Sequence, residues 1–156
     1  MLFIRRFQDG DEAPLREVFS TSVHDLTGVH YTAAQRAAWA PQDYDHEAWR
    51  ELLHTNQPFV VERNAANVAY ADLQPTGYID HFYVAGPFAG QGIGRRLMQH
   101  LFTTAMTQGF HGLCSQVSLT AEPFFLRSGF FVESRCSFLL RGVPMTNAHM
   151  RKSLLP

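Results

Sequence analysis

The sequence lacks several features that mark particular classes of protein. Lys and Arg total 13 against 14 Asp and Glu, and the resulting formal charge of -1 offers no excess of positive charge to a nucleic acid. No apolar run approaches the roughly 18 residues that a membrane-spanning helix needs. The start, Met1 to Arg6, places its charge after a very short apolar run, unlike an export signal. We expect a soluble, cytoplasmic protein with no nucleic acid and no membrane among its partners.

Cysteine is scarce, and the eight histidines are scattered. Cys114 and Cys136 lie on separate predicted strands and have no CxxC or histidine spacing around them. The histidines show no metal-ligand spacing either. We expect reduced, partly buried thiols and no metal site.

The chain is long enough to bury one substantial core. It has 156 residues, of which 46% are hydrophobic, and this size falls within the range of one domain. No internal repeat, low-complexity tract or linker interrupts it. We expect a single domain over residues 1–156.

Hydrophobic periodicity and turn residues predict alternating strands and helices. Strands are predicted at 2–6, 59–63, 68–73, 78–84, 113–119, 130–140 and 144–150. Helices are predicted between Asp11 and Gly28, over 31–39, after a cap at Asp45, from 93 to Gly109 and over 122–128. Hairpins followed by a strand-helix-strand unit indicate an α/β domain with a mixed sheet, rather than a doubly wound parallel sheet.

The strongest local signal is the glycine-rich segment Gly90-Gln91-Gly92-Ile93-Gly94 between a predicted strand and a predicted helix. Backbone N–H groups and the helix dipole meet an anion at such a position, and glycines let a phosphate approach closely. The spacing fits neither a GxxxxGK[ST] loop nor a dinucleotide fingerprint. An anion site and a purely structural turn both remain open on this segment alone.

Two segments together resemble the GNAT superfamily of N-acetyltransferases. Ala89 to Gly94 resembles its Gln/Arg-x-x-Gly-x-Gly/Ala motif, and Ala121 to Phe130 resembles its A-x-x-F-Y-x-x-x-G-F segment. Tyr78 to Phe82 and Thr146-Asn147 are similar to the bacterial YafP-like branch. The resemblance implies an α+β GNAT fold: a mixed central sheet of about seven strands, helices on both faces, and a cleft where the fourth and fifth strands splay apart.

The resemblance also implies that acetyl-CoA is the cosubstrate, without a metal. Its pantetheine would pair with backbone at Phe82, Tyr83 and Val84, and its pyrophosphate would meet the amides from Ala89 through Gly90, Gln91, Gly92, Ile93 and Gly94 to Arg95. A strand N–H near Phe82 or Tyr83 would polarise the acetyl carbonyl. Further contacts are expected from Ser118, Phe124, Phe125 and Arg127. Two positions depart from the family: Ala89 replaces Gln or Arg, and Phe125 replaces the tyrosine proposed as general acid.

Amine attack on a thioester requires a proton acceptor. Asp80 and His81 are the candidates, with Asp80 slightly favoured, and neighbouring strand residues point to opposite faces unless a bulge re-aims them. Both also have structural interpretations, as a backbone partner or a packed ring. Tyr83 or Tyr31 could replace the missing proton donor.

The acceptor pocket is expected between the first helices and the sheet. His24, Tyr31, Trp39 and Trp49 carry polar tips on large side chains there, although the two tryptophans are more typical of a core. We expect transfer of acetyl to an amine of a small molecule or peptide by direct attack. A longer acyl-CoA donor, a catalytically silent acetyl-CoA sensor and a homodimer remain alternatives or open questions.

Overall fold

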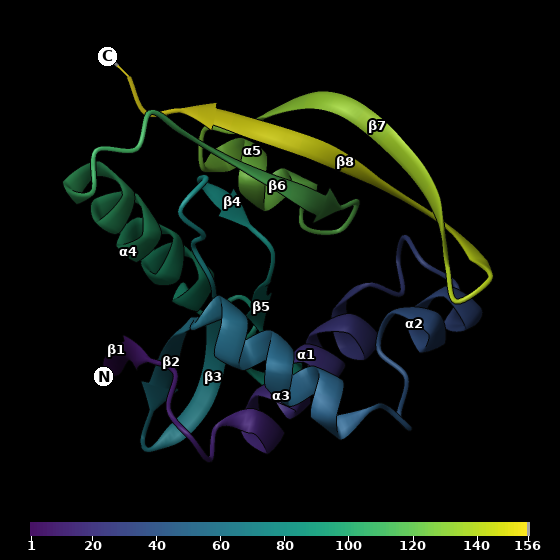
Figure 1. Ribbon diagram of the computed structural model, residues 1–156. Helices are drawn as coiled ribbons and strands as arrows, with labels where there is room; N and C mark the ends of the chain where they lie inside the picture. The colour runs from purple at the N-terminus through teal and green to yellow at the C-terminus, as the bar shows by residue number, and fades with distance from the viewer. Residues whose placement is uncertain (156) are drawn as a thin grey trace.

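The computed structural model describes residues 1–155 and confirms the mixed α/β class. Figure 1 shows the elements in chain order: β1 (Leu2–Arg6), α1 (Glu12–Leu26), α2 (Ala33–Trp39), α3 (His46–Asn56), β2 (Phe59–Arg63), β3 (Ala66–Ala71), β4 (Tyr78–Ile79), β5 (Phe82–Val84), α4 (Ile93–Thr107), β6 (Gly112–Ser118), α5 (Glu122–Arg127), β7 (Phe131–Leu140) and β8 (Val143–Ser153).

The strand count differs from the expected seven because the predicted strand 78–84 is divided. The chain forms two four-stranded sheets, in the orders β1-β2-β3-β5 and β4-β6-β8-β7. The first half of the divided strand pairs parallel with β6, with Tyr78 opposite Cys114. The second half pairs antiparallel with β3, with Tyr83 opposite Tyr70. Figure 1 shows the first sheet in the lower half of the molecule and the second in the upper half.

The first sheet is covered on both faces, as expected. Phe59 and Val61 of β2 are buried in one core with α4, whereas Val60 between them is buried in a second core with α1 and α3. This alternation follows from the two-residue period of a strand. The two cores also pack against opposite faces of β5, the second half of the divided strand, which is called the split strand below.

Local sequence rules explain several boundaries. The Asp45 side chain accepts a hydrogen bond from the Ala48 amide at 3.0 Å, which confirms the predicted cap of α3. Asn64 and Ala65 have φ of 51° and 65°, the left-handed conformation that a tight two-residue hairpin between β2 and β3 requires.

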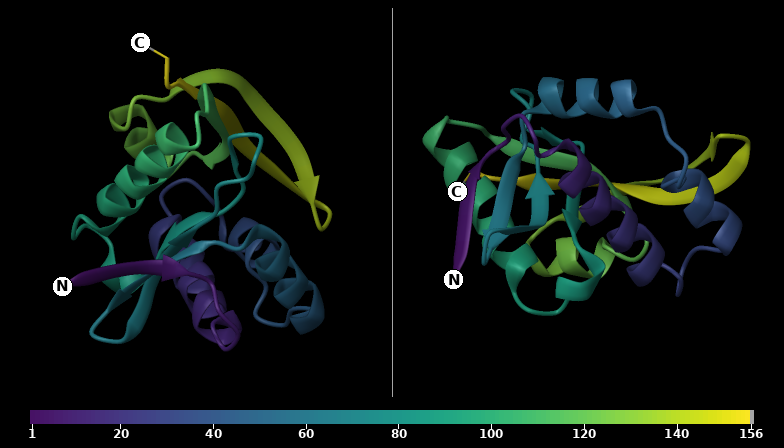
Figure 2. Two further views of the ribbon diagram at one scale, coloured as in Figure 1. Left: turned by 60° about the vertical axis from the view of Figure 1, so that its left-hand side comes forward. Right: turned by 90° about the horizontal axis from the view of Figure 1, so that it is seen from below.

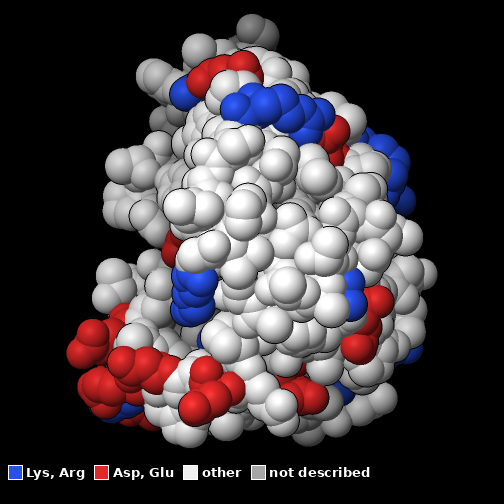
Figure 3. All heavy atoms as spheres, turned by 90° about the vertical axis from the view of Figure 1, so that its right-hand side faces the viewer, with Lys and Arg blue, Asp and Glu red and all other residues white. Residues whose placement is uncertain are grey.

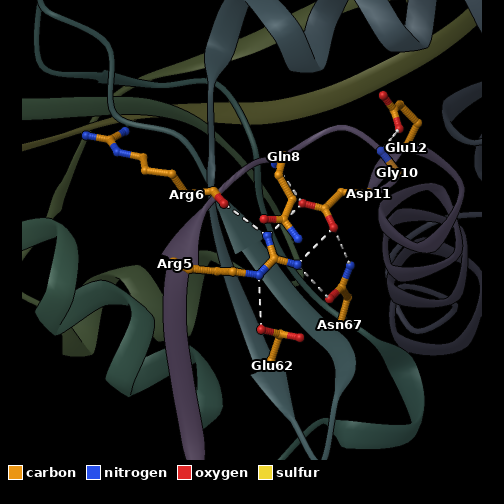
Figure 4. Close-up of polar contacts among 8 residues, drawn as sticks. All are labelled: Arg5, Arg6, Gln8, Gly10, Asp11, Glu12, Glu62 and Asn67. Carbon is orange, nitrogen blue, oxygen red and sulfur yellow. Dashed lines mark hydrogen bonds and ion pairs between the residues drawn. The ribbon is translucent and has the colours of Figure 1, made fainter.

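A polar network ties β1 to the start of α1 (Figure 4). Arg5 donates to both carboxylate oxygens of Asp11 at 2.8 and 2.9 Å, and to Glu62 of β2 at 3.0 Å. Burial raises the pKa of Asp11, but the bonds from Arg5 and from the Gln8 amide outweigh it and leave that pKa lowered. Asp11 is therefore a charged anchor between strand and helix.

The β7–β8 hairpin is long, and its β8 strand contacts α2 (Figures 1 and 2). Figure 3 shows the face at the end of this hairpin, where acidic side chains gather at the lower edge and no continuous Lys and Arg patch is visible. Among residues 1–155, every helix is too short or too polar to cross a bilayer.

Candidate active site

A cavity of about 1010 Å³ opens where the two sheets diverge. Only Tyr78 and Ile79 of β4 pair with β6 on this side, and β5 is the edge of the other sheet. The space beyond β4 is therefore left between β5 and β6. Most of the predicted site residues line it: Tyr31, Trp39, Asp80, Phe82, Tyr83, Val84, Ala89, Gly90, Gly92, Ile93, Gly94, Arg95, Ser118, Phe124, Phe125 and Arg127.

The backbone of β5 presents free polar groups to this cavity. The Asp72 amide donates to the His81 carbonyl at 3.2 Å, and the Ala85 amide donates to the Val68 carbonyl at 2.9 Å. Because hydrogen-bonding direction alternates along an antiparallel strand, the Tyr83 amide faces β3 while the amides of Phe82 and Val84 face away from it. Two N–H groups on an unpaired strand edge are thus available to a ligand.

The glycine-rich loop carries a second set of free donors. Gly90 and Gly92 have φ of 75° and 80°, and Gly92 caps the 15-residue helix α4 without a side-chain hydrogen bond. Within residues 1–155, the amides from Gly90 to Arg95 donate to no carbonyl or side chain. Free amides at a helix N-terminus form a site for an anion such as a phosphate.

Two arginines, one in the first turn of α4 and one at the end of α5, add positive charge to the cavity wall. Arg95 and Arg127 line the cavity, are exposed, and contact no carboxylate within the part of the chain that the structure describes. Both are thus available to a phosphate. Gln91 does not line the cavity, because its side-chain oxygen accepts a hydrogen bond from Arg63.

Aromatic rings form the part of the wall beside Gly94, where an added Cβ would lie 3.5 Å from the Phe124 ring. The Phe82 ring centroid lies 5.5 Å from that of Phe124 and 5.8 Å from that of Phe125. Phe125 is buried and has no group that could donate a proton. The Ser118 hydroxyl accepts from the Ala121 amide at 3.0 Å and keeps its own proton for another partner.

Asp80 and His81 lie at the break in the split strand, with different surroundings. Asp80 lines the cavity, its side chain is 32% exposed, and it accepts from Asn56 of α3 at 3.1 Å. His81 lies behind it, outside the cavity wall, with Nε2 3.8 Å from an Asp80 oxygen. The break brings the two neighbouring side chains together, which a regular strand would not do.

The protonation of His81 follows from its burial. Desolvation lowers the His81 pKa against the opposing effect of Asp80, so the ring is neutral near pH 7. Its Nδ1 lies 2.9 Å from the hydroxyl of Tyr70, whose pKa is raised by burial, so we assign that hydroxyl as the donor. The His81 Nε2–H then faces Asp80.

Sequence reasoning missed Asp72, which holds this break. Asp72 is fully buried, and its carboxylate accepts the Asp80 amide at 3.1 Å and the His81 amide at 2.6 Å. Burial raises its pKa to about 6 despite these two hydrogen bonds. The available signal was an acidic residue at the end of a run of apolar residues.

The expected acceptor residues separate into two groups. Tyr31 and Trp39 line the cavity with Tyr83, whose hydroxyl lies 3.2 Å from the donating Trp39 Nε1. His24 instead bonds the Ala40 carbonyl at 2.8 Å and lines a separate depression. Trp49 is buried in the core of α1 and α3, where its Nε1 donates to the Glu12 carbonyl at 2.8 Å.

The Tyr31 hydroxyl is fully engaged. It donates to the Thr146 carbonyl of β8 at 2.7 Å and accepts from the Leu119 amide, just after β6, at 3.0 Å. Burial raises the pKa of both Tyr31 and Tyr83, so both remain protonated near pH 7. Within residues 1–155, the hydroxyl proton of Tyr83 has no acceptor, whereas the hydroxyl proton of Tyr31 is donated to the Thr146 carbonyl.

A group of possible metal-ligating side chains lies outside the cavity. Ligand atoms of Asp9, Glu12 and His54 lie within 4.8 Å of one another near the start of α1 and the end of α3. Asp9 and His54 are exposed, and none of the three lines the cavity. This surface group has no link to the predicted site.

The comparisons with known proteins identify the family. The model of the acetyltransferase (GNAT) domain matches residues 27–154. The chain belongs to the GNAT acetyltransferase family, and it is an acyltransferase. It is 31% identical over 148 residues to the uncharacterised N-acetyltransferase YafP of Escherichia coli K12, covering 95% of this chain and 93% of YafP.

Solved structures agree with this assignment. A GCN5-related N-acetyltransferase from Rhodopseudomonas palustris superposes with a TM-score of 0.92 at 26% identity, covering 97% of this chain and 95% of that one. PaiA from Thermoplasma acidophilum, solved with coenzyme A, gives a TM-score of 0.76 at 16% identity over 98% and 99% of the two chains. YncA from Salmonella typhimurium, solved with acetyl-CoA, gives a TM-score of 0.70 at 21% identity, covering 100% of this chain and 95% of that one. The expected GNAT fold is confirmed.

Proposed function

We propose that this protein transfers an acetyl group from acetyl-CoA to a primary amine of a small molecule or peptide by direct attack. The observation that carries the proposal is the pair of unpaired donor sets in one cleft, on the β5 edge and at the start of α4. The relatives solved with coenzyme A or acetyl-CoA support this choice of cosubstrate.

The donor side of the cavity fits coenzyme A. The amides of Gly90 to Arg95, with Arg95 and Arg127, would hold the pyrophosphate. The Phe82 carbonyl, the edge groups of Val84 and the hydroxyl of Ser118 would pair with the pantetheine amides. The Ala89 side chain has no polar group, and the Ala89 amide donates to the Gly86 carbonyl at 3.3 Å, so Ala89 adds no donor to the phosphate site.

The acyl group is proposed to be short. Phe82, Phe124 and Phe125 contact one another at the cavity wall, with ring centroids 5.5 to 5.8 Å apart. A longer acyl chain would have to separate these rings. Acetyl therefore fits better than a long acyl group.

The acceptor side provides one carboxylate and several aromatic rings. The Asp80 carboxylate lines the cavity and would take the proton of the attacking amine, directly or through one water. The amine nitrogen forms a bond to the acetyl carbon as the carbon–sulfur bond breaks, and the Phe82 amide would stabilise the charge that develops on the carbonyl oxygen. Asn56 donates to the Asp80 carboxylate at 3.1 Å and would orient it, whereas His81 Nε2 at 3.8 Å is too far for a hydrogen bond.

The leaving sulfur needs a proton or must depart as a thiolate. Phe125 cannot supply the proton, and the Tyr31 hydroxyl is engaged with Thr146. Tyr83 is the remaining hydroxyl of the two proposed donors, and its raised pKa keeps the proton in place near pH 7. A thiol with an ordinary pKa of about 8.5 is already a fair leaving group, so Tyr83 would accelerate the step rather than make it possible.

The experiment is an acetyl-transfer assay on purified protein. Acetyl-CoA should raise the melting temperature, and CoA release above a blank without amine should appear with at least one member of a broad amine panel. Phe125 favours a second candidate, a catalytically silent sensor. A raised melting temperature with no CoA release from any amine would support the sensor and contradict the transferase. The cytoplasmic location and a homodimer stay predictions.

A further inference from the structure

The break in the split strand replaces one regular hydrogen bond with two unusual ones. The Asp72 amide donates to the His81 carbonyl at 3.2 Å, so in a regular ladder the His81 amide would return a bond to the Asp72 carbonyl. Here the Asp72 side chain accepts that amide at 2.6 Å and the Asp80 amide at 3.1 Å. A buried carboxylate thus serves two amides that have no strand partner.

These two amides lie where the chain passes from one sheet to the other. Before them, β4 pairs with β6, and after them, β5 pairs with β3. The Asp80 side chain reaches the cavity, and Phe82, directly after His81, begins the free edge of β5. The proton acceptor and the proposed oxyanion donor are therefore both attached to the segment that Asp72 holds.

We propose that Asp72 is a positioning residue for acetyl transfer, whose carboxylate fixes the Asp80–His81 break and thereby aims Asp80 and the Phe82 amide into the cavity. This inference rests on the proposed function. Asp72 itself is fully buried and does not line the cavity, so it acts through Asp80 and Phe82.

The charged form of Asp72 is the one that accepts both amides. The titratable groups that face it are Asp80, His81, Tyr70, Tyr78 and Tyr83; burial lowers the pKa of the imidazole and raises the pKa of the three phenols, so these four groups are uncharged near pH 7. Burial raises the Asp72 pKa to about 6, so at pH 7 the carboxylate is ionised. Protonation would turn one of its oxygens into a donor that faces an amide.

Asp72→Asn imitates that protonated form at nearly constant volume. With the amide nitrogen in place of Oδ2, it would face the Asp80 amide and the Gln74 side-chain amide, which also donates to Oδ2 at 3.2 Å. In the flipped orientation it would face the His81 amide. In either orientation, the new side-chain NH₂ group faces at least one N–H donor in place of an acceptor. Asp43→Asn, at an exposed position, is the matched control for the change in net charge.

The first test requires no enzymatic activity. Hydrogen exchange followed by NMR should show the amides of Asp80 and His81 exchanging at least about tenfold faster in Asp72→Asn than in the wild type and in Asp43→Asn. Asp72→Ser, which is shorter, provides a second variant if Asp72→Asn does not fold. Unchanged exchange of both amides in a folded variant would overturn the proposal.

The second test measures turnover with an arylamine whose nitrogen stays unprotonated over the pH range. In Asp72→Asn, kcat should fall at least about tenfold at pH 7.5, while the acetyl-CoA Kd should stay within about twofold because the loop amides are untouched. Wild-type kcat should fall as the pH is lowered through about 6, toward the level of the variant, whose own profile lacks this step.

Two results of the second test would contradict the proposal. One is an Asp72→Asn variant with the kcat of the wild type, and the other is a joint loss of kcat and acetyl-CoA affinity, which would indicate general damage to the fold. If the wild-type protein transfers no acetyl group at all, the proposed function fails. The exchange rates then still decide whether Asp72 holds the two amides.

Discussion

Two substitutions of Gly92 test whether the loop binds the pyrophosphate, because they differ in side-chain charge but not in shape. Gly92→Asp adds a carboxylate where we expect the pyrophosphate, and Gly92→Asn adds a side chain of the same shape without the charge. A Cβ at Gly92 meets no atom within 4 Å, so neither substitution clashes with the fold. Gly92 has a φ of 80°, and the left-handed conformation costs both variants a similar amount, about 1–2 kcal/mol.

The difference between the two variants measures the electrostatic effect. Two unit charges about 5 Å apart at an effective dielectric constant of about 20 repel by about 3 kcal/mol. Because the loop is exposed, screening reduces this to about 1–2 kcal/mol, or about 5- to 30-fold in Kd. Gly92→Asp should bind CoA more weakly than Gly92→Asn by this factor.

Isothermal titration calorimetry of CoA at low and high salt checks the prediction. The gap between the variants should narrow as salt increases, and their melting temperatures without ligand should be similar. Equal Kd values for Gly92→Asp and Gly92→Asn at low salt would refute the assignment of the loop amides to the pyrophosphate.

Three further substitutions test other parts of the structure. Asp80→Asn removes the proposed proton acceptor and should lower turnover at pH 7 by about 10²–10⁴-fold with unchanged CoA affinity by calorimetry; wild-type turnover would transfer the role to His81 or to water. Tyr31→Phe removes the hydroxyl that joins β6 to β8 and should lower the free energy of unfolding in urea by about 1–3 kcal/mol; an unchanged value would mean that these two bonds add nothing to stability. Asp11→Asn weakens the pair with Arg5 and should cost about 1.5–3 kcal/mol at pH 7. Because the folded pKa of Asp11 is lowered, this difference should persist above the ordinary value of about 3.9 and shrink as the pH falls through the folded pKa; a difference independent of pH in urea titrations would contradict the assignment.

The parts of the fold that local rules govern could be predicted from the sequence. The glycine-rich segment lies between a strand and a helix, as expected, because left-handed φ values at Gly90 and Gly92 are a local requirement. The Asp45 cap follows from the same kind of rule, and so does a hairpin after β2, although its turn is Asn64-Ala65 and not the expected 64–67. Each depends on residues that are close together in the chain.

The hydrogen bonds made by the polar groups of individual side chains could not be predicted, because their partners are distant in the sequence. Tyr31 was expected at the acceptor, and it does line the cavity, yet its hydroxyl is bound by Thr146 and Leu119 far along the chain. His24 was expected beside it, but its ring is held by the Ala40 carbonyl outside the cavity. Residue type indicates which hydrogen bonds a side chain can make, whereas the fold decides which of them it makes.

The division of the strand 78–84 shows a similar limit, with one exception. Its residues other than Asp80 and His81 are aromatic or β-branched and favour a strand, and they do not reveal that the first half pairs with β6 and the second with β3. A charged side chain at the end of a buried strand is costly, so its presence implies donors that the regular sheet does not use. Asp72 is such a residue, and its donors are the two amides that the change of sheet leaves without a partner. An acidic residue at the end of an apolar strand is therefore a sequence sign of a break in the neighbouring strand, and here that break lies beside the proposed chemistry.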